Sequence, residues 1–325
     1  MVSQGDGKVH NRTTKTRKCR ILISMNVERV RIWVGLGIIS FVWGSTWLAI
    51  KIGLGSAPPF FAAGIRFAIA SSILFIIVRT RRLHIPVTPD AKKLYLVLGL
   101  LSFGIPYALV YWGEQFIPSG LCSVLFAAYP FWVAIFSHLL LRNERLDPFK
   151  VPGIILGFAG LVVIFSGDLE WSGPSALLGM AAIMTSTVVQ GFALIMIKKY
   201  GQPVNPFAMN LVGMTIGAVV LAALGVAFER DRQFAFNSAA IGSILYLAAV
   251  GSVIAFVTYH WLLKRIEAVY LSLTTFINPV IAVILGAMVL GEMLSPTVFA
   301  GSGLVLAGIL TANGKQLYRK VHARL

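Results

Sequence analysis

Arg66 points most directly to chemistry, because it is the one ionisable side chain that lies clearly inside a long apolar segment. Placing a guanidinium group at the centre of a membrane helix costs about 2.5–3.5 kcal/mol on insertion scales, so the group needs a polar partner or a wet cavity. One interpretation is a contact with an anionic group, or a gate. The other, which we favour, is a structural role close to the helix end at Pro59, about two helical turns away.

The first apolar segment carries a stripe of small, polar and aromatic side chains. Ser40, Gly44, Trp47 and Lys51 are spaced by whole helical turns, and Trp43 lies beside them. Such a stripe is typical of a cavity wall, so Trp43 and Trp47 are candidate substrate-binding residues; the alternative is an interfacial aromatic belt. Lys51, at the end of the segment, is expected to extend its amine to the lipid headgroups.

Two further segments place polar aromatic residues at matching positions. Tyr107 and Tyr111 are one turn apart in the third segment, and Tyr259 and His260 occupy the corresponding region of the eighth. All four are candidate cavity residues. A buried histidine can titrate near neutral pH, which would suit proton coupling; the favoured alternative is a histidine with satisfied hydrogen bonds.

The dipeptides Tyr129-Pro130 and Asn278-Pro279 lie at equivalent depths in the fourth and ninth segments. Proline removes a backbone donor and frees a carbonyl one turn earlier, which kinks the helix and requires a partner or a cavity inside a membrane. We interpret Pro130 and Pro279 as hinges, and Tyr129 and Asn278 as substrate-binding candidates. Gln190 is expected to add an amide to the same centre.

These dipeptides belong to an internal repeat. They are 149 positions apart, and Glu144 and Glu292, which follow them, are 148 apart. Each half holds an odd number of apolar segments, so the second copy crosses the membrane in the opposite direction, as in alternating-access transporters. The two glutamates themselves are expected to be helix caps or ion-pair partners at opposite membrane faces.

Composition sets the fold class. The 325 residues are 57% hydrophobic and 12% charged, with a mean hydropathy of +0.82, whereas soluble domains carry about 25% charged residues. We therefore predict an all-α polytopic membrane protein of ten transmembrane helices, arranged as two inverted five-helix repeats. The expected spans are 32–51, 59–78, 94–113, 117–141, 151–167, 174–197, 207–227, 240–263, 268–290 and 297–313. The repeats cover 32–167 and 174–313, and the basic tails 1–31 and 314–325.

Charge predicts orientation. Of the 28 lysines and arginines, 24 fall in the tails and connections of one face and three in those of the other. Basic loops resist translocation, so both termini are predicted to be cytoplasmic, with the protein in the inner (plasma) membrane. The net charge of +16 therefore reflects topology, and no nucleic-acid partner is expected. The sequence shows no signal peptide, and translation from Met25 fits it as well as translation from Met1.

The sequence contains little that would support catalysis. Cys19 and Cys122 fit no metal-ligand spacing. The spans contain no aspartate, no paired carboxylates and no obvious buried carboxylate to carry a proton. We therefore expect no catalytic residue, metal site or cofactor, and regard a polytopic membrane enzyme acting on lipid-linked or small amphipathic substrates as the less favoured alternative.

Four short motifs carry a family resemblance. They are Trp43-Gly44-Ser45-Thr46-Trp47, Ile50-Lys51, Pro58-Pro59 and Arg66-Phe67. They resemble the opening signature of the drug/metabolite transporter superfamily, EamA branch, and each half resembles one EamA repeat. The second half departs from the signature: residues 43–47 correspond to 189–193, and Arg66 corresponds to about Gly213. The resemblance implies a ten-helix permease that exports amino acids, other small metabolites or drugs through a cavity between the halves.

The predicted function is secondary active export of small amphipathic or zwitterionic metabolites by alternating access. Few fixed charges favour such solutes over highly phosphorylated ones, which would require several basic side chains. The expected partners are a small-molecule substrate and membrane lipid, with protons as one candidate coupling ion. A monomer and a homodimer both remain open.

Overall fold

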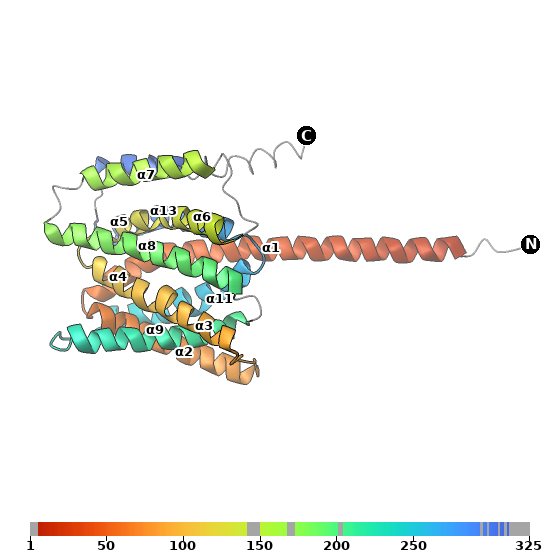
Figure 1. Cartoon of the computed structure of the whole chain (residues 1–325), viewed down its shortest axis with the longest axis horizontal. Helices are drawn as coiled ribbons and strands as arrows, with labels where there is room; N and C mark the ends of the chain where they lie inside the picture. Colours follow the sequence, from red (N-terminus) through yellow and green to blue (C-terminus); the bar gives the residue numbers. More distant parts are fainter. Residues whose placement is uncertain are drawn as a thin grey trace, which may run out of the picture.

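The structure, a computed structural model of the chain, describes residues 6–141, 150–167, 173–200, 204–292, 295–297, 299–304, 306–308 and 311. These residues form helices joined by short turns, without a strand among them, which confirms the all-α class. The helices lie side by side as a bundle, and the first extends far beyond it toward the N-terminus (Figure 1). The segment predicted as an N-terminal tail thus continues the first helix from Asp6.

The helices follow the order of the predicted spans. Their bounds are α1 (Asp6–Leu54), α2 (Pro59–Thr80), α3 (Pro89–Leu98), η1 (Gly99–Gly104), α4 (Ile105–Gly113), α5 (Ser119–Phe126), α6 (Tyr129–Leu140), α7 (Lys150–Gly167), α8 (Pro174–Tyr200), α9 (Pro206–Phe228), α10 (Ser238–Tyr246), η2 (Leu247–Ile254), α11 (Ala255–Leu263), α12 (Ala268–Ser272), η3 (Leu273–Phe276) and α13 (Ile277–Leu290). Local sequence explains where several helices start. The side chains of Thr88, Asn205 and Asn237 each accept a hydrogen bond from a backbone N–H of the first turn of the helix that follows.

Seven helical segments of the described chain are long and apolar enough to cross a membrane. The other three expected spans correspond to α7, to α12–η3–α13, and to a last segment of which residues 299–308 are described in part. The protein is therefore a multi-pass membrane protein. The expected C-terminal tail and Glu144 lie outside the described residues.

Four spans are interrupted, at positions that correspond between the two halves. The third and eighth spans each contain a π-helical turn, η1 and η2. The fourth span breaks between α5 and α6, and the ninth passes through the 3-10 turn η3. Pro130 and Pro279 follow these last two breaks within the first three residues of α6 and α13. At each predicted kink, the regular α-helical hydrogen bonding of the span is interrupted.

One lysine in each repeat joins two spans of that repeat in the same way, at opposite ends of the bundle. The Lys51 amine donates to the carbonyl oxygens of Glu114 and Ile117, at 2.7 and 2.8 Å. The Lys198 amine donates to those of Leu263 and Ile266, at 2.5 and 2.7 Å. The expectation that Lys51 reaches lipid headgroups is therefore wrong, because the short link after α4 presents carbonyl groups that need donors. We call the two sides of the bundle the Lys51 end and the Lys198 end.

Close helix contacts fix the register of the repeat. A Cβ atom added to Gly44 would lie 2.7 Å from the Ile281 Cβ, and one added to Gly191 would lie 2.9 Å from the Trp132 Cβ. Gly44 and Gly191 are 147 positions apart, as are Lys51 and Lys198. Residues 43–47 therefore correspond to 190–194, one residue later than the sequence comparison suggested.

Replacing Gly44 with alanine tests the contact between α1 and α13. The new methyl group has no room against Ile281, and such overpacking typically costs about 1–3 kcal/mol. We expect a lower thermal unfolding midpoint in detergent. Gly37→Ala, on the same helix with no atom within 4 Å of the added Cβ, should leave the midpoint unchanged or slightly higher. Equal midpoints for the two variants would contradict this packing.

Candidate functional site

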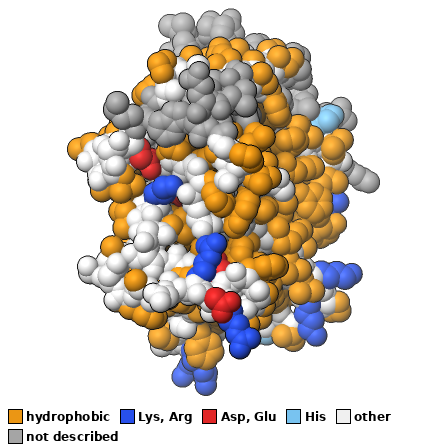
Figure 2. Space-filling model, turned by 90° about the vertical axis from the view of Figure 1, so that its left-hand side faces the viewer, with side chains coloured by type: hydrophobic (Ala, Val, Ile, Leu, Met, Phe, Trp, Pro, Cys, Tyr) orange, Lys and Arg blue, Asp and Glu red, His pale blue; other side chains and the backbone are white. Residues whose placement is uncertain are grey.

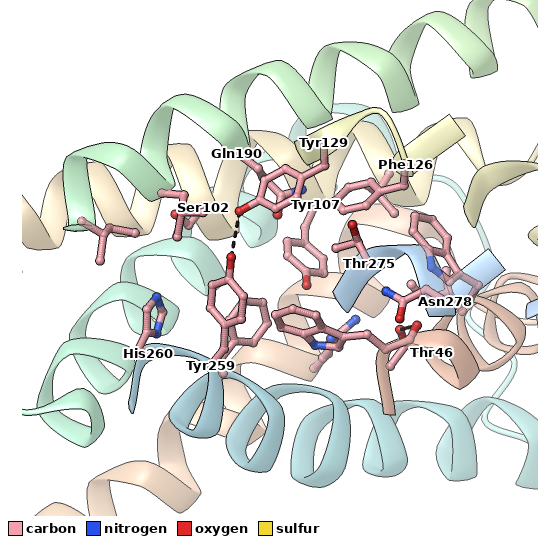
Figure 3. A pocket seen from close by; sticks show the side chains of 18 residues that line it. Thr46, Ser102, Tyr107, Phe126, Tyr129, Gln190, Tyr259, His260, Thr275 and Asn278 are labelled. Atoms are coloured by element: carbon pink, nitrogen blue, oxygen red, sulfur yellow. Dashed lines mark hydrogen bonds between the residues drawn. The ribbon is translucent and has the colours of Figure 1, made fainter. Parts of the chain in front are cut away.

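A cavity of about 70 Å³ lies between the two repeats. Figure 3 shows its side chains converging from helices of both halves. The lining residues are Trp43, Thr46, Trp47, Ile50, Arg66, Ser102, Tyr107, Val110, Phe126, Tyr129, Gln190, Leu194, Ile197, Phe256, Tyr259, His260, Thr275 and Asn278.

Most of the lining consists of pairs that occupy equivalent positions in the two repeats. The pairs are Trp43 with Gln190, Trp47 with Leu194, Ile50 with Ile197, Tyr107 with Phe256, Val110 with Tyr259, Phe126 with Thr275, and Tyr129 with Asn278. The cavity therefore lies on the pseudo-two-fold axis that relates the halves. The paired positions carry different chemistry, so the symmetry concerns the backbone and not the ligand-facing groups.

The structure brings nearly all of the sequence-predicted site residues together. Nine of the ten candidate residues line the cavity. The tenth, Tyr111, is not among the lining residues and accepts a hydrogen bond from Arg66. Pro130 and Pro279 lie just behind the lining, each four positions after the paired residues Phe126 and Thr275. Proline lacks the N–H that these two carbonyl groups would normally receive, so the freed acceptors lie beside the cavity.

Arg66 is 1% exposed and is held by neutral groups. Its Nε donates to the Ser252 Oγ at 2.9 Å, and its terminal nitrogens donate to the Tyr111 hydroxyl at 3.3 Å and the Gly251 carbonyl at 3.4 Å. The guanidinium carbon also lies 4.9 Å from the centre of the Tyr107 ring. Arg66 is thus held in place by neutral groups and also lines the cavity, and its contact with an anionic group stays a prediction.

The π-helical turn η2 creates this arginine site. Ser252 donates to the Leu247 carbonyl, five residues earlier, and its oxygen remains available to accept from Arg66. Gly251 permits the close approach, since an added Cβ would lie 2.9 Å from Thr46 and 3.4 Å from the guanidinium. No carboxylate lies within ion-pairing distance of Arg66 in the part of the chain that the structure describes. Among the described residues, the cavity wall therefore carries a cation that forms no ion pair.

Aromatic rings from both halves form the apolar wall. Trp43 packs against Tyr259 and Phe256, with ring centroids 4.9 and 5.2 Å apart. The Tyr129 and Tyr259 hydroxyls are 3.0 Å apart and join the repeats across the cavity, as Figure 3 shows. These contacts give the cavity an apolar wall that is built by both halves.

Two polar atoms of the wall have no protein partner. The Trp43 Nε1 and the Asn278 Oδ1 are buried without a hydrogen bond among the described residues. A buried donor or acceptor left unpaired costs about 1–3 kcal/mol, so each is a natural contact for a bound solute or water. The cavity thus presents a cation, a donor and an acceptor within aromatic walls.

His260 is engaged with a neighbouring helix. Its Nδ1 lies 3.1 Å from the Asn210 Oδ1, while the Asn210 amide donates to the Pro206 carbonyl at 2.9 Å. Since that oxygen can only accept, Nδ1 carries the proton of this bond. The geometry matches the favoured expectation of a hydrogen-bonded histidine.

Sequence reasoning missed one charged residue near this site. Glu114 is 0% exposed, and neither carboxylate oxygen has a hydrogen-bond partner among the described residues. The expectation that no buried carboxylate exists is therefore wrong. Glu114 falls in the short link between two apolar segments, where a loop position suggests exposure, although its i+7 spacing from Tyr107 was a signal that it shares the cavity-facing stripe.

A multi-pass bundle of two inverted repeats around a cavity defines the architecture of a membrane transporter. The EamA-like transporter family matches residues 31–166 and 177–314, so the chain belongs to that family, with one copy in each half.

Similar proteins come from several bacteria. The uncharacterized transporter YoaV of Bacillus subtilis is 29% identical over 86% of this chain and 96% of its own length. The uncharacterized inner membrane transporter YedA of Escherichia coli K12 is 30% identical over 85% and 89%, and protein PagO of Salmonella typhimurium is 30% identical over 83% and 88%. A solved crystal structure matches with a TM-score of 0.68 at 20% identity, covering 89% of this chain and 97% of its own, which supports the fold.

Replacing Ser252 with alanine tests the support of Arg66. The variant leaves a buried charged donor without its acceptor, and a hydrogen bond to a charged group contributes about 1.5–3 kcal/mol. We expect a clearly lower thermal unfolding midpoint. Ser72→Ala removes a serine that is exposed and bonds only the Ala68 carbonyl one turn earlier, so its midpoint should match the wild type. A stable Ser252→Ala protein would show that Arg66 does not depend on the Ser252 hydroxyl.

Proposed function

We propose that this protein is a secondary active transporter that exports small amphipathic or zwitterionic metabolites, such as amino acids, related compounds or drugs. The observation that carries the proposal is the cavity on the pseudo-two-fold axis, with Arg66 as an unneutralised cation in its wall. The names of the family and of its relatives support membrane transport in general, and the chemistry of the cavity supports the substrate class.

The substrate class follows from the polar groups of the wall. Arg66 suits a carboxylate, and a guanidinium can bind one through two parallel hydrogen bonds. The Asn278 Oδ1 suits an ammonium or hydroxyl donor, and the Trp43 Nε1 suits an acceptor. The rings of Trp47, Phe126 and their neighbours leave the remaining wall apolar. A solute with one anionic group, one donor and an apolar body satisfies all of these groups together.

Alternating access is supported by the way each end of the bundle closes. Ile50 and Ile197 line opposite limits of the cavity, and each is followed by the lysine that holds the adjacent link. Helix breaks next to Pro130 and Pro279 place irregular backbone in the spans that these links lead into. Rocking of one repeat against the other would open one end while the other end stays closed.

Orientation follows from the positions of the basic residues. The connections that are rich in lysine and arginine belong to the Lys198 end, whereas those of the Lys51 end contain few of these residues. Figure 2 faces the Lys51 end and shows only a few charged side chains among the polar atoms near its centre, with hydrophobic side chains around them. We therefore place the Lys51 end outside the cell and the termini in the cytoplasm.

A polytopic enzyme is the second candidate class. Among the described residues no group of three or more histidine, cysteine or acidic side chains is placed to hold a metal ion. Nothing in the cavity wall pairs a nucleophile with a base, so no specific observation favours this candidate.

Orientation can be tested with single cysteines in a variant whose Cys19 and Cys122 are replaced. We expect Arg230→Cys, exposed at the Lys51 end, to react with a membrane-impermeant maleimide in intact cells. Arg82→Cys, exposed at the Lys198 end, should react only after permeabilisation. The reverse pattern of labelling would overturn the orientation.

Transport can be tested by counterflow in proteoliposomes. Vesicles loaded with unlabelled amino acids should accumulate the labelled form of at least one of them through the wild-type protein. Asn278→Ala should reduce this accumulation at least about tenfold, as expected for a lost contact of about 1.4 kcal/mol or more. Phe75→Leu, on the exposed surface of α2, should transport normally. If the wild type moves no amino acid, amphipathic metabolite or drug from a broad panel, the proposed function fails.

A further inference from the structure

Glu114 is the buried charge-bearing group that the cavity chemistry leaves unused. It follows the last residue of α4 and lies one helical turn beyond Val110, which lines the cavity. Its side chain is fully buried, and both carboxylate oxygens lack a hydrogen-bond partner among the described residues. An ionised carboxylate in such a place would lose its hydration without gaining donors, which is costly.

The neighbouring groups explain which protonation state this place favours. Lys51 of α1 and Arg66 of α2 lie near enough to favour the anion, and Glu292 disfavours it. The Lys51 amine is directed to two backbone carbonyl groups and makes no ion pair with the Glu114 carboxylate. The other titratable groups facing Glu114 are Tyr111 on its own helix and Cys122 on α5. Burial is the largest influence, and it raises the pKa of the Glu114 carboxyl well above its ordinary value.

The Glu292 carboxylate, unlike that of Glu114, has several hydrogen-bond donors among the described residues. It accepts hydrogen bonds from the Ser119 N–H at 3.0 Å, the Ser119 hydroxyl at 2.8 Å and the Gly120 N–H at 3.3 Å. These donors belong to the N-terminus of α5, which favours a negative charge. Gly291, with φ of +66°, turns the chain after α13 so that Glu292 reaches this site. Two carboxyl groups in one low-dielectric region do not ionise together readily, so Glu114 is the neutral member.

The same contacts close the Lys51 end. Glu292 joins the end of α13 to the start of α5, and Lys51 joins α1 to the link between α4 and α5. Glu114 is enclosed between these two connections. Opening this end would part Glu292 from the start of α5 and admit water, which would solvate an ionised Glu114 beside the Lys51 amine. Closing it again would require the carboxyl to take up a proton.

We propose that Glu114 is a proton-binding site that takes up a proton from outside as the Lys51 end closes and releases it toward the cavity when the opposite end opens, so that a proton enters as substrate is exported. On closing, the carboxylate takes a proton from the water at the Lys51 end and becomes a carboxylic acid. Val110 and Tyr111 separate Glu114 from the cavity by a single helical turn, which gives the proton a short path to the other side. The coupling role depends on the proposed transport function; the protonation of Glu114 does not.

Infrared spectroscopy tests proton binding without any substrate. In lipid, the wild-type protein should show the carbonyl stretch of a protonated carboxyl group at neutral pH, where an ordinary glutamate, with a pKa of about 4.3, is ionised. Glu114→Gln should lose this band while keeping its unfolding midpoint, because the amide resembles the neutral acid. Glu229→Gln is the matched control, since Glu229 is 2% exposed but accepts the Phe60 and Phe61 N–H groups. A band that persists in Glu114→Gln would overturn the proposal.

Proteoliposomes test the coupling. For a labelled amino acid that the wild type moves in counterflow, vesicles with an acidic lumen should accumulate that amino acid as protons leave. Glu114→Gln should keep counterflow and lose the gradient-driven accumulation, whereas Glu229→Gln should keep both. Gradient-driven accumulation that survives in Glu114→Gln would overturn the coupling role. An absence of counterflow in the wild type would instead reject the transport function, while the infrared result would still decide whether Glu114 binds a proton.

Discussion

Hydrogen-bond satisfaction inside the membrane is the constraint on which the rest of this structure depends. A backbone N–H or C=O group has no water to bond in the hydrocarbon region, so irregular backbone is tolerated only where protein groups or a wet cavity complete it. The irregular turns of the third, fourth and ninth spans border the central cavity, and that of the eighth span bonds Arg66 in the cavity wall. Where the links between spans leave carbonyl groups exposed, Lys51 and Lys198 supply the donors.

The same constraint explains how the two repeats differ. Their backbones share broken helices, lysine contacts and glycine approaches at equivalent positions. Their side chains differ at the cavity, where Trp43 corresponds to Gln190 and Tyr129 corresponds to Asn278. Arg66 corresponds to Gly213, and two of its three hydrogen-bond partners come from η2 of the other repeat. The backbone is thus symmetric, whereas the side chains give the cavity a single cation on one side.

Much of the candidate site could be predicted from sequence because membrane helices project their residues in a regular way. Helical spacing grouped Trp43 with Trp47, and the repeat grouped Tyr129 with Asn278; the structure places all four on one cavity. Two features of the site could not be predicted from the sequence. A π-helical turn adds one residue to a turn without a distinctive residue type, so the partners of Arg66 could not be inferred. Glu114 looked exposed because its burial comes from contacts made by α1 and the segment after α13.

The sequence alone determined the helical class, the internal repeat and the set of helix faces that meet, since these depend on local hydrophobicity and periodicity. Only the tertiary structure decided which polar groups are satisfied. The Lys51 amine could have reached lipid headgroups, but two carbonyl groups of the link between α4 and α5 lie closer. The Arg66 guanidinium could have bonded carbonyl groups at the end of its own helix, but η2 offers it acceptors. These outcomes depend on groups far apart in the chain, whose distances no local pattern encodes.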